Sequence, residues 1–182
     1  MSIEPFLYLF DATPARQWLI LDRDGTINVD HGYTHAVQTL EFMPGALEAL
    51  TRLAAEGWGI AIATNQAGLA KGLFTREDME SFNWALIQRL ASQGVAIRGL
   101  AACPHHPEGT VDELAVPCLC RKPASGLLHA LSAQHNFTLE RAIYVGNASE
   151  DAAAAGAANM KFYWCRNGIE WNDLLTGETK KT

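Results

Sequence analysis

Residues 18–26 of the chain read Trp18-Leu19-Ile20-Leu21-Asp22-Arg23-Asp24-Gly25-Thr26. The apolar residues at the start of this stretch predict a short buried strand, and the polar residues that follow predict the loop in which the strand ends. In an open α/β sheet, ligands gather at the carboxyl ends of the strands. The stretch therefore predicts a buried strand, with two carboxylates, Asp22 and Asp24, where a ligand would bind.

Segments of the same character follow along the chain. We expect further strands over residues 59–63, 142–145 and 161–164, and a strand or loop over 95–102. We expect helices over residues 44–56, 75–94, 125–135 and 150–158. Short strands without alternation, separated by helices, indicate a parallel sheet that is covered on both faces. The predicted fold class is therefore α/β.

The chain has 182 residues, of which 48% are hydrophobic and 19% are charged. These values predict one globular domain over residues 1–182, with residues 104–117 as a long inserted loop and a polar tail over 167–182 that frays at its end. The net charge of −6 provides no excess of basic residues for a nucleic-acid backbone or an anionic membrane surface. We therefore expect neither nucleic acid nor a membrane as a partner.

Residues 1–10 show no targeting pattern. They contain Glu4 and Pro5, and they lack both a basic region and a small-residue cleavage site. No run of about 18 apolar residues occurs in the chain. We therefore expect a cytoplasmic protein.

Polar side chains follow several of the predicted strands. They are Asp22, Asp24, Thr64, Asn65, Asn147, Glu150 and Asp151, with Lys122 in the segment before the strand at 142–145. This set suits phosphoryl transfer, because one carboxylate can attack phosphorus, another can carry the proton, and Mg²⁺ can bind through oxygen. An ordinary turn is the competing interpretation of Asp22 and Asp24 alone. A calcium loop is excluded, because Gly25 stands at the fourth position instead of the sixth and Tyr33 replaces the bidentate Glu.

Three of the four cysteines crowd around a histidine. They form a C-x-H…C-x-C set of Cys103, His105, Cys118 and Cys120. Three thiolates and one imidazole complete the tetrahedral shell of zinc without an open position, so the set predicts a structural zinc ion in a loop at about 103–120. A cluster of buried free thiols or a disulfide is the competing interpretation. Cys165 lies outside the set and is expected to pack as a small apolar residue.

The order of these motifs resembles a known family. Residues 22–26 (DRDGT) resemble the first motif, Asp-x-Asp-Gly-Thr, of the haloacid dehalogenase superfamily of phosphatases. One family within it, the D-glycero-D-manno-heptose 1,7-bisphosphate 7-phosphatases, is similar at 22–33 (DRDGTINVDHGY), 64–74 (TNQAGLAKGLF), 103–109 (CPHHPEG) and 118–123 (CLCRKP). The first motif is specific only to the superfamily, whereas the cysteine-containing insertion is much more specific.

The resemblance spans about residues 18–164 and implies both a fold and an activity. The implied fold is a Rossmann-like three-layer sandwich with a mostly parallel central sheet, without a large cap domain, in a monomeric protein. The implied activity is removal of the C7 phosphate from the heptose bisphosphate. This step belongs to the synthesis of nucleotide-activated heptose for lipopolysaccharide or a related glycan. The expected partner is thus a small phosphosugar.

The resemblance also implies a role for each matching residue around the phosphate. Asp22 would be the nucleophile that forms an aspartyl-phosphate, and Asp24 would protonate the leaving sugar oxygen and then activate water. Thr64 and Lys122 would bind the phosphoryl group, with Asn65 beside them.

Two further assignments follow from the same resemblance. Mg²⁺ would bind a side-chain oxygen of Asp22, the backbone carbonyl of Asp24 and the side chain of Asn147. Arg121 would contact the second phosphate of a bisphosphate, because a planar guanidinium suits phosphate geometry, and an ordinary surface arginine is the alternative.

The fourth motif departs from the family pattern. The family has Gly-Asp-x-x-x-Asp, whereas residues 146–151 read GNASED. Asn147 can offer a carbonyl oxygen to a hard cation but carries no negative charge, so the affinity for Mg²⁺ is expected to fall. In addition, Ala148 replaces a lysine of relatives, and Lys71 replaces an arginine. The chain is then a weakened or altered phosphatase in which Glu150 or Asp151 partly compensates, a phosphosugar-binding relative without turnover, or a sequence altered to stop hydrolysis. We favour the first.

Three other functions compete with this interpretation. Histidinol-phosphate phosphatase shares the first motif and the zinc, but its loop between the two halves of the cysteine set is shorter. A zinc-stabilised binding protein for phosphosugars or for another protein would bind without turnover. A polynucleotide 3′-phosphatase is disfavoured by the acidic charge balance and by the lack of a basic, aromatic-bearing groove.

Overall fold

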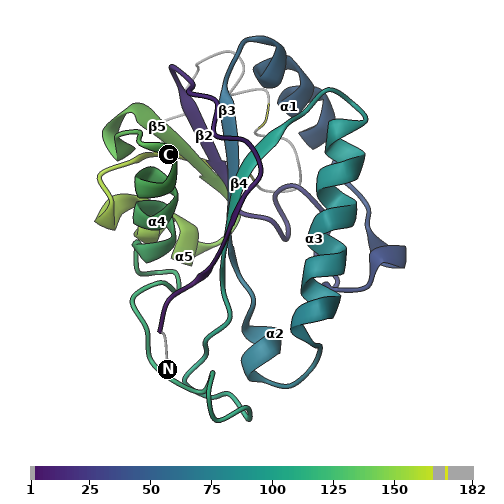
Figure 1. Cartoon of the computed structure of the whole chain (residues 1–182), viewed down its shortest axis with the longest axis vertical. Helices are drawn as coiled ribbons and strands as arrows, with labels where there is room; N and C mark the ends of the chain where they lie inside the picture. The colour runs from purple at the N-terminus through teal and green to yellow at the C-terminus, as the bar shows by residue number, and fades with distance from the viewer. Residues whose placement is uncertain (1–2, 166–170, 172–182) are drawn as a thin grey trace.

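The computed structural model describes residues 3–165 and residue 171, and within them a six-stranded sheet forms the centre of the molecule (Figure 1). The strands are β1 (Phe6–Leu9), β2 (Trp18–Leu21), β3 (Gly59–Asn65), β4 (Ile97–Cys103), β5 (Ala142–Gly146) and β6 (Lys161–Trp164). The helices are α1 (Ala46–Ala55), α2 (Ala67–Ala70), α3 (Arg76–Ala91), α4 (Gly126–His135) and α5 (Ser149–Ala157), with short 3₁₀ turns η1 (Val37–Thr39) and η2 (Leu139–Arg141).

The sheet order is β1-β4-β3-β2-β5-β6. All pairs are parallel except β1 with β4, which is antiparallel. In the register of the central strands, Leu21 of β2 lies opposite both Ile62 of β3 and Val145 of β5. The carboxyl ends of these three strands are therefore neighbours. The predicted α/β class with a mostly parallel sheet is confirmed.

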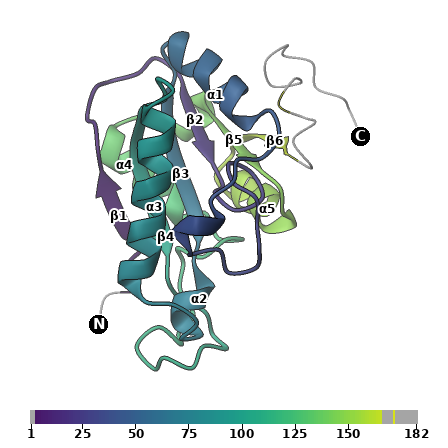
Figure 2. The same cartoon turned by 90° about the vertical axis from the view of Figure 1, so that its right-hand side faces the viewer.

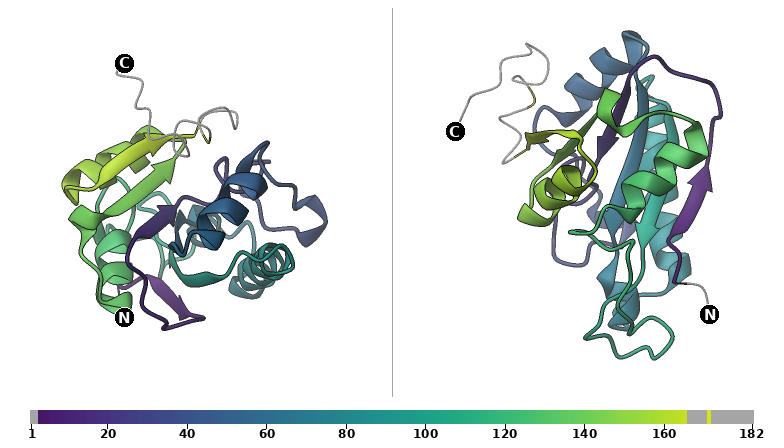
Figure 3. Two further views of the ribbon diagram at one scale, coloured as in Figure 1. Left: turned by 90° about the horizontal axis from the view of Figure 1, so that it is seen from above. Right: turned by 90° about the vertical axis from the view of Figure 1, so that its left-hand side faces the viewer.

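The central strand β2 shows why helices cover both faces of the sheet. All of its residues are buried, and successive side chains of a strand point to opposite faces. Leu19 and Leu21 join a core with α1 and α3, whereas Trp18 and Ile20 join a second core with α4 and α5. Figure 2 views the face with α3, and the right-hand view of Figure 3 shows the opposite face with α4. A strand buried on both faces needs a continuous apolar run, as the sequence has here.

Among the strands and α-helices, two elements are missing from the sequence-based prediction. The edge strand β1 exposes Leu7 and Leu9 and packs only Phe6 and Tyr8 against the core. All four residues are apolar or aromatic, so their types do not show which side chains are buried. The single turn of α2 is too short for helical periodicity to be detected. The segment at 95–102, left open between strand and loop, forms the strand β4 and extends to Cys103.

The remaining predicted elements agree with the structure within a few residues at each end. The clearest boundary is the start of α3, where the side chain of Thr75 accepts from the backbone of Asp78 and the Asp78 carboxylate accepts from the backbone of Thr75. This capping box satisfies two otherwise unpaired backbone groups, as the sequence predicts.

Residues 104–117 contain turns but no helix or strand. The backbone nitrogens of Thr110 and Val111 both donate to the carbonyl of Ala70, at 2.7 and 2.9 Å, so this loop packs against α2. The tail over 167–182, apart from Trp171, lies outside the described residues, and so does its expected fraying. Among the helices that the structure describes, none is both long and apolar enough to cross a membrane.

We predict that Trp18→Ala lowers the free energy of unfolding by about 3–5 kcal/mol, because it empties a filled site in the core. The Trp18 ring is 3% exposed and lies 4.6 Å from the ring of Phe137 and 4.7 Å from that of His135. Trp84→Ala is the matched control, since Trp84 is 57% exposed and its loss should change stability by less than about 0.5 kcal/mol. Urea denaturation of both variants measures the difference, and equal effects would contradict the packing described for β2.

Candidate active site

A cavity of about 430 Å³ lies where β2, β3 and β5 end. Asp22 follows β2 directly, Thr64 lies near the end of β3, and Asn147 follows β5. The sheet therefore brings together side chains that are far apart in the sequence. The cavity is lined by every residue expected around the phosphate and the magnesium ion, namely Asp22, Asp24, Thr64, Asn65, Arg121, Lys122 and Asn147.

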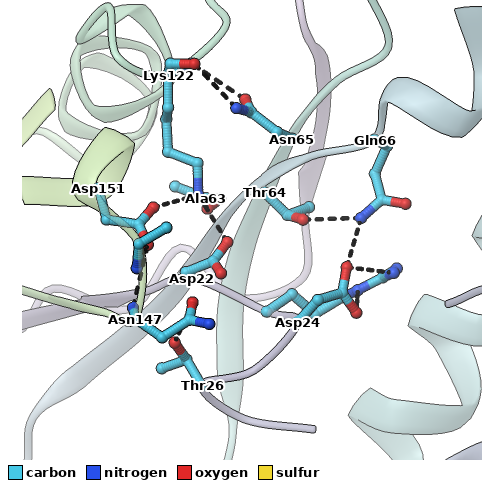
Figure 4. A network of polar contacts seen from close by, with 12 residues as sticks. Asp22, Asp24, Thr26, Ala63, Thr64, Asn65, Gln66, Lys122, Asn147 and Asp151 are labelled. Carbon is cyan, nitrogen blue, oxygen red and sulfur yellow. Dashed lines mark hydrogen bonds and ion pairs between the residues drawn. The ribbon is translucent and has the colours of Figure 1, made fainter. Parts of the chain in front are cut away.

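Lys122 is the centre of a buried polar network (Figure 4). Its Nζ lies 2.6 Å from Asp22 Oδ1 and 2.7 Å from Asp151 Oδ1. The same nitrogen donates to the hydroxyl of Tyr144 at 3.0 Å and to the carbonyl of Ala63 at 3.1 Å. An ammonium this deeply buried is tolerated only with close anionic partners, which two carboxylates supply.

Burial and the charge of Lys122 have opposite effects on the pKa of Asp22. Burial raises the pKa of Asp22 to about 7, while the positive charge of Lys122 opposes this rise and the negative charge of Asp151 adds to it. Burial alone would lower the pKa of Lys122. The negative charges of Asp22 and Asp151 raise this pKa by more than burial lowers it, so that it lies well above its usual value. Lys122 therefore stays charged and holds Oδ1 of Asp22 at a fixed position.

Asn65 holds the backbone of Lys122 in place. Its Nδ2 donates to the carbonyl of Lys122 at 3.0 Å, and its Oδ1 accepts from the backbone nitrogen of Lys122 at 3.1 Å. Both polar atoms of the Asn65 side chain therefore bind the backbone of Lys122. Asn65 lines the cavity, as expected, but its polar atoms position Lys122.

Asp24 accepts hydrogen bonds on both carboxylate oxygens. Its neighbour Arg23 donates from Nε to Oδ1 at 3.1 Å and from Nη2 to Oδ2 at 2.8 Å. Asn28 Nδ2 donates to Oδ1 at 2.9 Å, and Gln66 Nε2 donates to Oδ2 at 3.0 Å. The nitrogen of Gln66 also donates to Thr64 Oγ1 at 2.8 Å, which leaves the hydroxyl proton of Thr64 free to face a ligand.

Asn147 brings a third oxygen to the position expected for the magnesium ion. In one orientation its amide oxygen faces Oδ2 of Asp22 and the carbonyl of Asp24, and accepts from the Thr26 hydroxyl at 3.4 Å. With the amide turned over, its nitrogen donates to these two atoms at 3.3 and 3.2 Å. Three converging oxygens with no proton between them are the donor set of a hard cation, so the residues present fit Mg²⁺. Gly25 makes this approach possible, because a Cβ there would lie 2.2 Å from Asn147 Nδ2.

Glu150 and Asp151 differ in whether they could supply the negative charge that Asn147 lacks. Asp151 is 1% exposed, and its Oδ2 accepts from the backbone nitrogens of Asn147 and Ala148 at 3.1 and 3.0 Å. Its Oδ1 lies against Lys122. Asp151 therefore caps α5 and pairs with the lysine, whereas Glu150 is exposed at the rim of the cavity.

Basic and polar side chains line the part of the cavity away from the sheet. Arg121 and His106 come from the inserted loop and its end, and Lys71 follows α2. Lys71 Nζ donates to the hydroxyl of Tyr33 at 2.8 Å, and Arg121 Nη1 donates to the carbonyl of His105 at 3.4 Å. These groups offer donors to an anion larger than one phosphate.

The cysteine set closes into one cluster. The ligand atoms of Cys103, His105, Cys118 and Cys120 all lie within 4.8 Å of one another. The sulfur separations are 3.2, 3.3 and 3.6 Å, and His105 Nδ1 lies 3.4 Å from Cys120 Sγ and 3.7 Å from Cys103 Sγ. Tetrahedral zinc with Zn–S bonds of about 2.3 Å requires thiolates about 3.8 Å apart. The four atoms are therefore close to the required spacing and could hold a metal ion such as zinc.

The electrostatics of the cluster also suit a cation. A hydrogen bond from Cys120 lowers the pKa of the Cys103 thiol to about 6, with a further contribution from His105, and the same bond raises the pKa of Cys120. The thiols share protons that a metal would displace, because zinc binds the thiolate. No disulfide joins these cysteines. Cys165 is buried in the hydrophobic core, as predicted.

Several residues of the network are missing from the sequence-based site, among them Arg23, Asn28, Gln66 and Tyr144. Tyr144 places a hydroxyl in an apolar strand, two residues before the strand ends. This position indicates a polar contact near the carboxyl end of the strand. Arg23 gives a similar signal, since it stands between two acids at the end of a buried strand. Gln66 gives none, because a glutamine beside Asn65 suits a loop equally well.

Comparison with known proteins adds independent information. The family model described as polynucleotide kinase 3 phosphatase matches residues 19–166. A protein of Yersinia pestis named D-glycero-beta-D-manno-heptose-1,7-bisphosphate 7-phosphatase is 41% identical over 142 residues, which cover 78% of this chain and 76% of that protein.

Solved structures give the same result. A protein from Mesorhizobium loti that has been assigned as a HAD-like phosphatase aligns with a TM-score of 0.84 at 27% identity, over 96% of this chain and 93% of that chain. The D,D-heptose 1,7-bisphosphate phosphatase of B. bronchiseptica, solved with magnesium and phosphate, aligns with a TM-score of 0.74 at 29% identity, over 91% and 89% of the two chains. This chain belongs to the D-glycero-D-manno-heptose 1,7-bisphosphate 7-phosphatase family of the haloacid dehalogenase superfamily.

Proposed function

We propose that this protein is a Mg²⁺-dependent phosphatase that removes the C7 phosphate of D-glycero-D-manno-heptose 1,7-bisphosphate, in the synthesis of nucleotide-activated heptose. The observation that carries the proposal is the convergence of Asp22, Thr64 and Lys122 on one cavity, in a chain that is 41% identical to a relative named for this reaction. A carboxylate, a hydroxyl and a buried ammonium at one point can attack and hold a phosphoryl group.

In the first step, an oxygen of Asp22 attacks phosphorus and the bond from phosphorus to the sugar oxygen breaks. Asp24 enters this step as the carboxylic acid and gives its proton to that leaving oxygen, and an aspartyl-phosphate remains on Asp22. Oδ1 of Asp22 is the attacking atom, because Oδ2 faces the cation position. The Thr64 hydroxyl and the Lys122 ammonium bind the phosphoryl oxygens.

In the second step, water attacks the phosphorus of the aspartyl-phosphate. Asp24 takes a proton from this water, phosphate leaves, and the carboxylate of Asp22 is restored. Bound Mg²⁺, held by Asp22, the carbonyl of Asp24 and Asn147, would neutralise charge on the phosphoryl oxygens. Asn65 and Tyr144 keep the ammonium of Lys122 in reach of the same oxygens throughout.

The second phosphate of the substrate binds away from the sheet. Arg121 is the main donor in this proposal, with Lys71 and His106 beside it along the cavity wall. Zinc at the cysteine set supports this arrangement, because Cys120 directly precedes Arg121 and Lys122 in the chain.

Four further properties are part of the proposal. Residues 1–182 form a single domain with the zinc loop at about 103–120, the protein is a monomer, it lies in the cytoplasm, and it does not bind nucleic acid. The net charge of −6 supports the last of these, since a polynucleotide phosphatase needs basic residues along its groove.

One observation favours a second candidate function, a phosphosugar-binding relative with impaired turnover. Asn147 brings no negative charge to the cation position, and Asp151, which could have compensated, is committed to Lys122 and to the start of α5. Binding of the sugar bisphosphate without release of phosphate would identify this candidate.

The primary proposal is tested with the heptose bisphosphate and Mg²⁺. We expect release of the C7 phosphate only, faster than release from histidinol phosphate, with the remaining C1 phosphate identified by ³¹P NMR. Asp22→Asn should lower the rate by at least about 10³-fold, because the nucleophile is lost. Asp112→Asn, at an exposed position of the inserted loop, is the matched control and should leave the rate unchanged. A wild-type chain that binds the sugar but releases no phosphate would refute the proposal.

The contribution of Asn147 is tested by Asn147→Asp. We expect this variant to bind Mg²⁺ about tenfold more tightly or better, about 1.4 kcal/mol, because a carboxylate adds a full negative charge to the ligand set. Isothermal titration with Mg²⁺ measures this affinity without substrate. Asn159→Asp adds the same charge at an exposed position outside the cavity and should leave the affinity as it is. Equal affinities of the Asn147 variant and the wild type would show that position 147 is not a ligand.

Zinc is tested by elemental analysis and by variants of the cluster. We expect about one zinc ion per chain, lost in Cys120→Ser together with more than about 3 kcal/mol of unfolding free energy, because loss of a metal site is among the strongly destabilising changes. Cys165→Ser removes a buried thiol outside the cluster and should keep the zinc. A purified wild-type chain without zinc, or a Cys120 variant that keeps it, would contradict the assignment.

A further inference from the structure

The amide of Gln66 joins two groups with different tasks in the proposed reaction. Its Nε2 lies 2.8 Å from Thr64 Oγ1 and 3.0 Å from Asp24 Oδ2 (Figure 4). Gln66 directly follows β3 and is 3% exposed, and its backbone nitrogen donates to the carbonyl of Cys103 at 2.7 Å. The amide is therefore fixed between the hydroxyl that binds the phosphoryl group and the carboxylate that carries the proton.

As arranged, Asp24 has no acceptor position left for a substrate. A carboxylate offers about four lone-pair positions. Arg23 fills two of them, and Asn28 and Gln66 fill one each. One of these donors must give way before Asp24 can contact the leaving oxygen or a water molecule.

Two of the donor residues, Arg23 and Asn28, make further contacts that fix their positions. Arg23 is fully buried, donates to Asn83 Oδ1 at 2.7 Å and to the carbonyl of Thr34 at 2.6 Å, and lies 4.6 Å from the centre of the Phe82 ring. Asn28, also fully buried, donates to the carbonyl of Val29 as well.

Gln66 differs from these donors in its position. Gln66 lines the cavity, whereas Arg23 and Asn28 do not. It is therefore the donor that a bound ligand can reach. An anionic phosphoryl oxygen bound to Thr64 would lie beside Nε2 of Gln66. It would compete with Asp24 for the hydrogen bond from this nitrogen, because hydrogen bonds to charged acceptors are the stronger ones.

We infer that Gln66 is a positioning residue, which aims Oδ2 of Asp24 at the cavity and frees it, when a phosphoryl group binds to Thr64, to take a proton from water in the cavity and pass it to the leaving oxygen. The inference rests on the proposed function. Without the Gln66 amide, only Arg23 and Asn28 hold Asp24, and both hold it from the side away from the cavity. Proton transfer to a poor leaving group then slows, while attack by Asp22 on phosphorus does not need this transfer when the leaving group is good.

The test compares two leaving groups in single-turnover reactions with Mg²⁺. The heptose bisphosphate releases an alcohol, which needs a proton, and p-nitrophenyl phosphate releases a phenolate, which does not. For Gln66→Met we expect the maximal rate of alcohol release to fall about 10- to 100-fold and the half-saturating sugar concentration to change less than about twofold. The rate of phenolate release should stay within about twofold. Asp24→Asn should show the same selective loss.

Two further variants complete the design. Gln66→Glu keeps the length of the side chain but sets a carboxylate against Asp24, and should slow alcohol release at least as much as Gln66→Met. Gln88→Met, at an exposed position of α3, is the matched control and should change neither rate.

The outcomes separate this inference from the proposed function. A wild-type chain that cleaves neither substrate would refute the proposed function. An active wild type whose Gln66 variants lose both reactions equally, or lose neither, would overturn the inference. Thermal melting monitors folding, and failure of both Gln66 variants to fold would likewise overturn it, by assigning the residue to the fold alone.

Discussion

The buried ammonium of Lys122 is the interaction on which the rest of the site depends. A positive charge at 4% exposure must be compensated nearby, and the two carboxylates within 2.7 Å supply this compensation. Those carboxylates come from the ends of β2 and the start of α5, so the pairing ties three distant parts of the chain to one point. The lining of the whole cavity is net negative, because it contains five acids and three bases, namely Asp22, Asp24, Asp30, Glu150 and Asp151 against Lys71, Arg121 and Lys122. A cation and a phosphoryl group can then enter as a neutralising pair, which a cavity lined only by cations would not favour.

The cysteine cluster and Asn65 explain how a lysine from a loop reaches this point. Residues 104–117 have no regular structure, and ordering such a loop carries a large entropic cost. The cysteine cluster closes the loop between Cys103, at the end of β4, and Cys120. Lys122 follows Cys120 by two residues, and the side chain of Asn65 binds both backbone polar groups of this lysine. The lysine is thus held by its backbone, and its side chain spans only a short distance into the cavity.

Residue order predicted which side chains meet but not how they share their hydrogen bonds. The apolar run at Trp18 and the motif that follows it fixed the strand and the place of Asp22, because a buried strand and the loop after it are both local properties. Sequence patterns could not show that Asn65 serves the backbone of Lys122, which is 57 residues away. Nor could they show that Gln66 bridges Thr64 and Asp24. Such pairings depend on sheet order and on side-chain rotamers, which periodicity does not encode.

Asn147 bears on the proposed cation position through its charge and through the hydrogen bonds of its amide. Where the family pattern has an aspartate, a second carboxylate would face Oδ2 of Asp22 and the carbonyl of Asp24, and this repulsion would be relieved by a cation. The amide of Asn147 has a second way to satisfy the same oxygens, since it can turn and donate to both at 3.3 and 3.2 Å. A cation must then displace a hydrogen-bonded amide rather than relieve a repulsion. We therefore expect the amide to weaken Mg²⁺ binding in two ways, through the negative charge that it lacks and through the hydrogen bonds that a bound cation would have to replace.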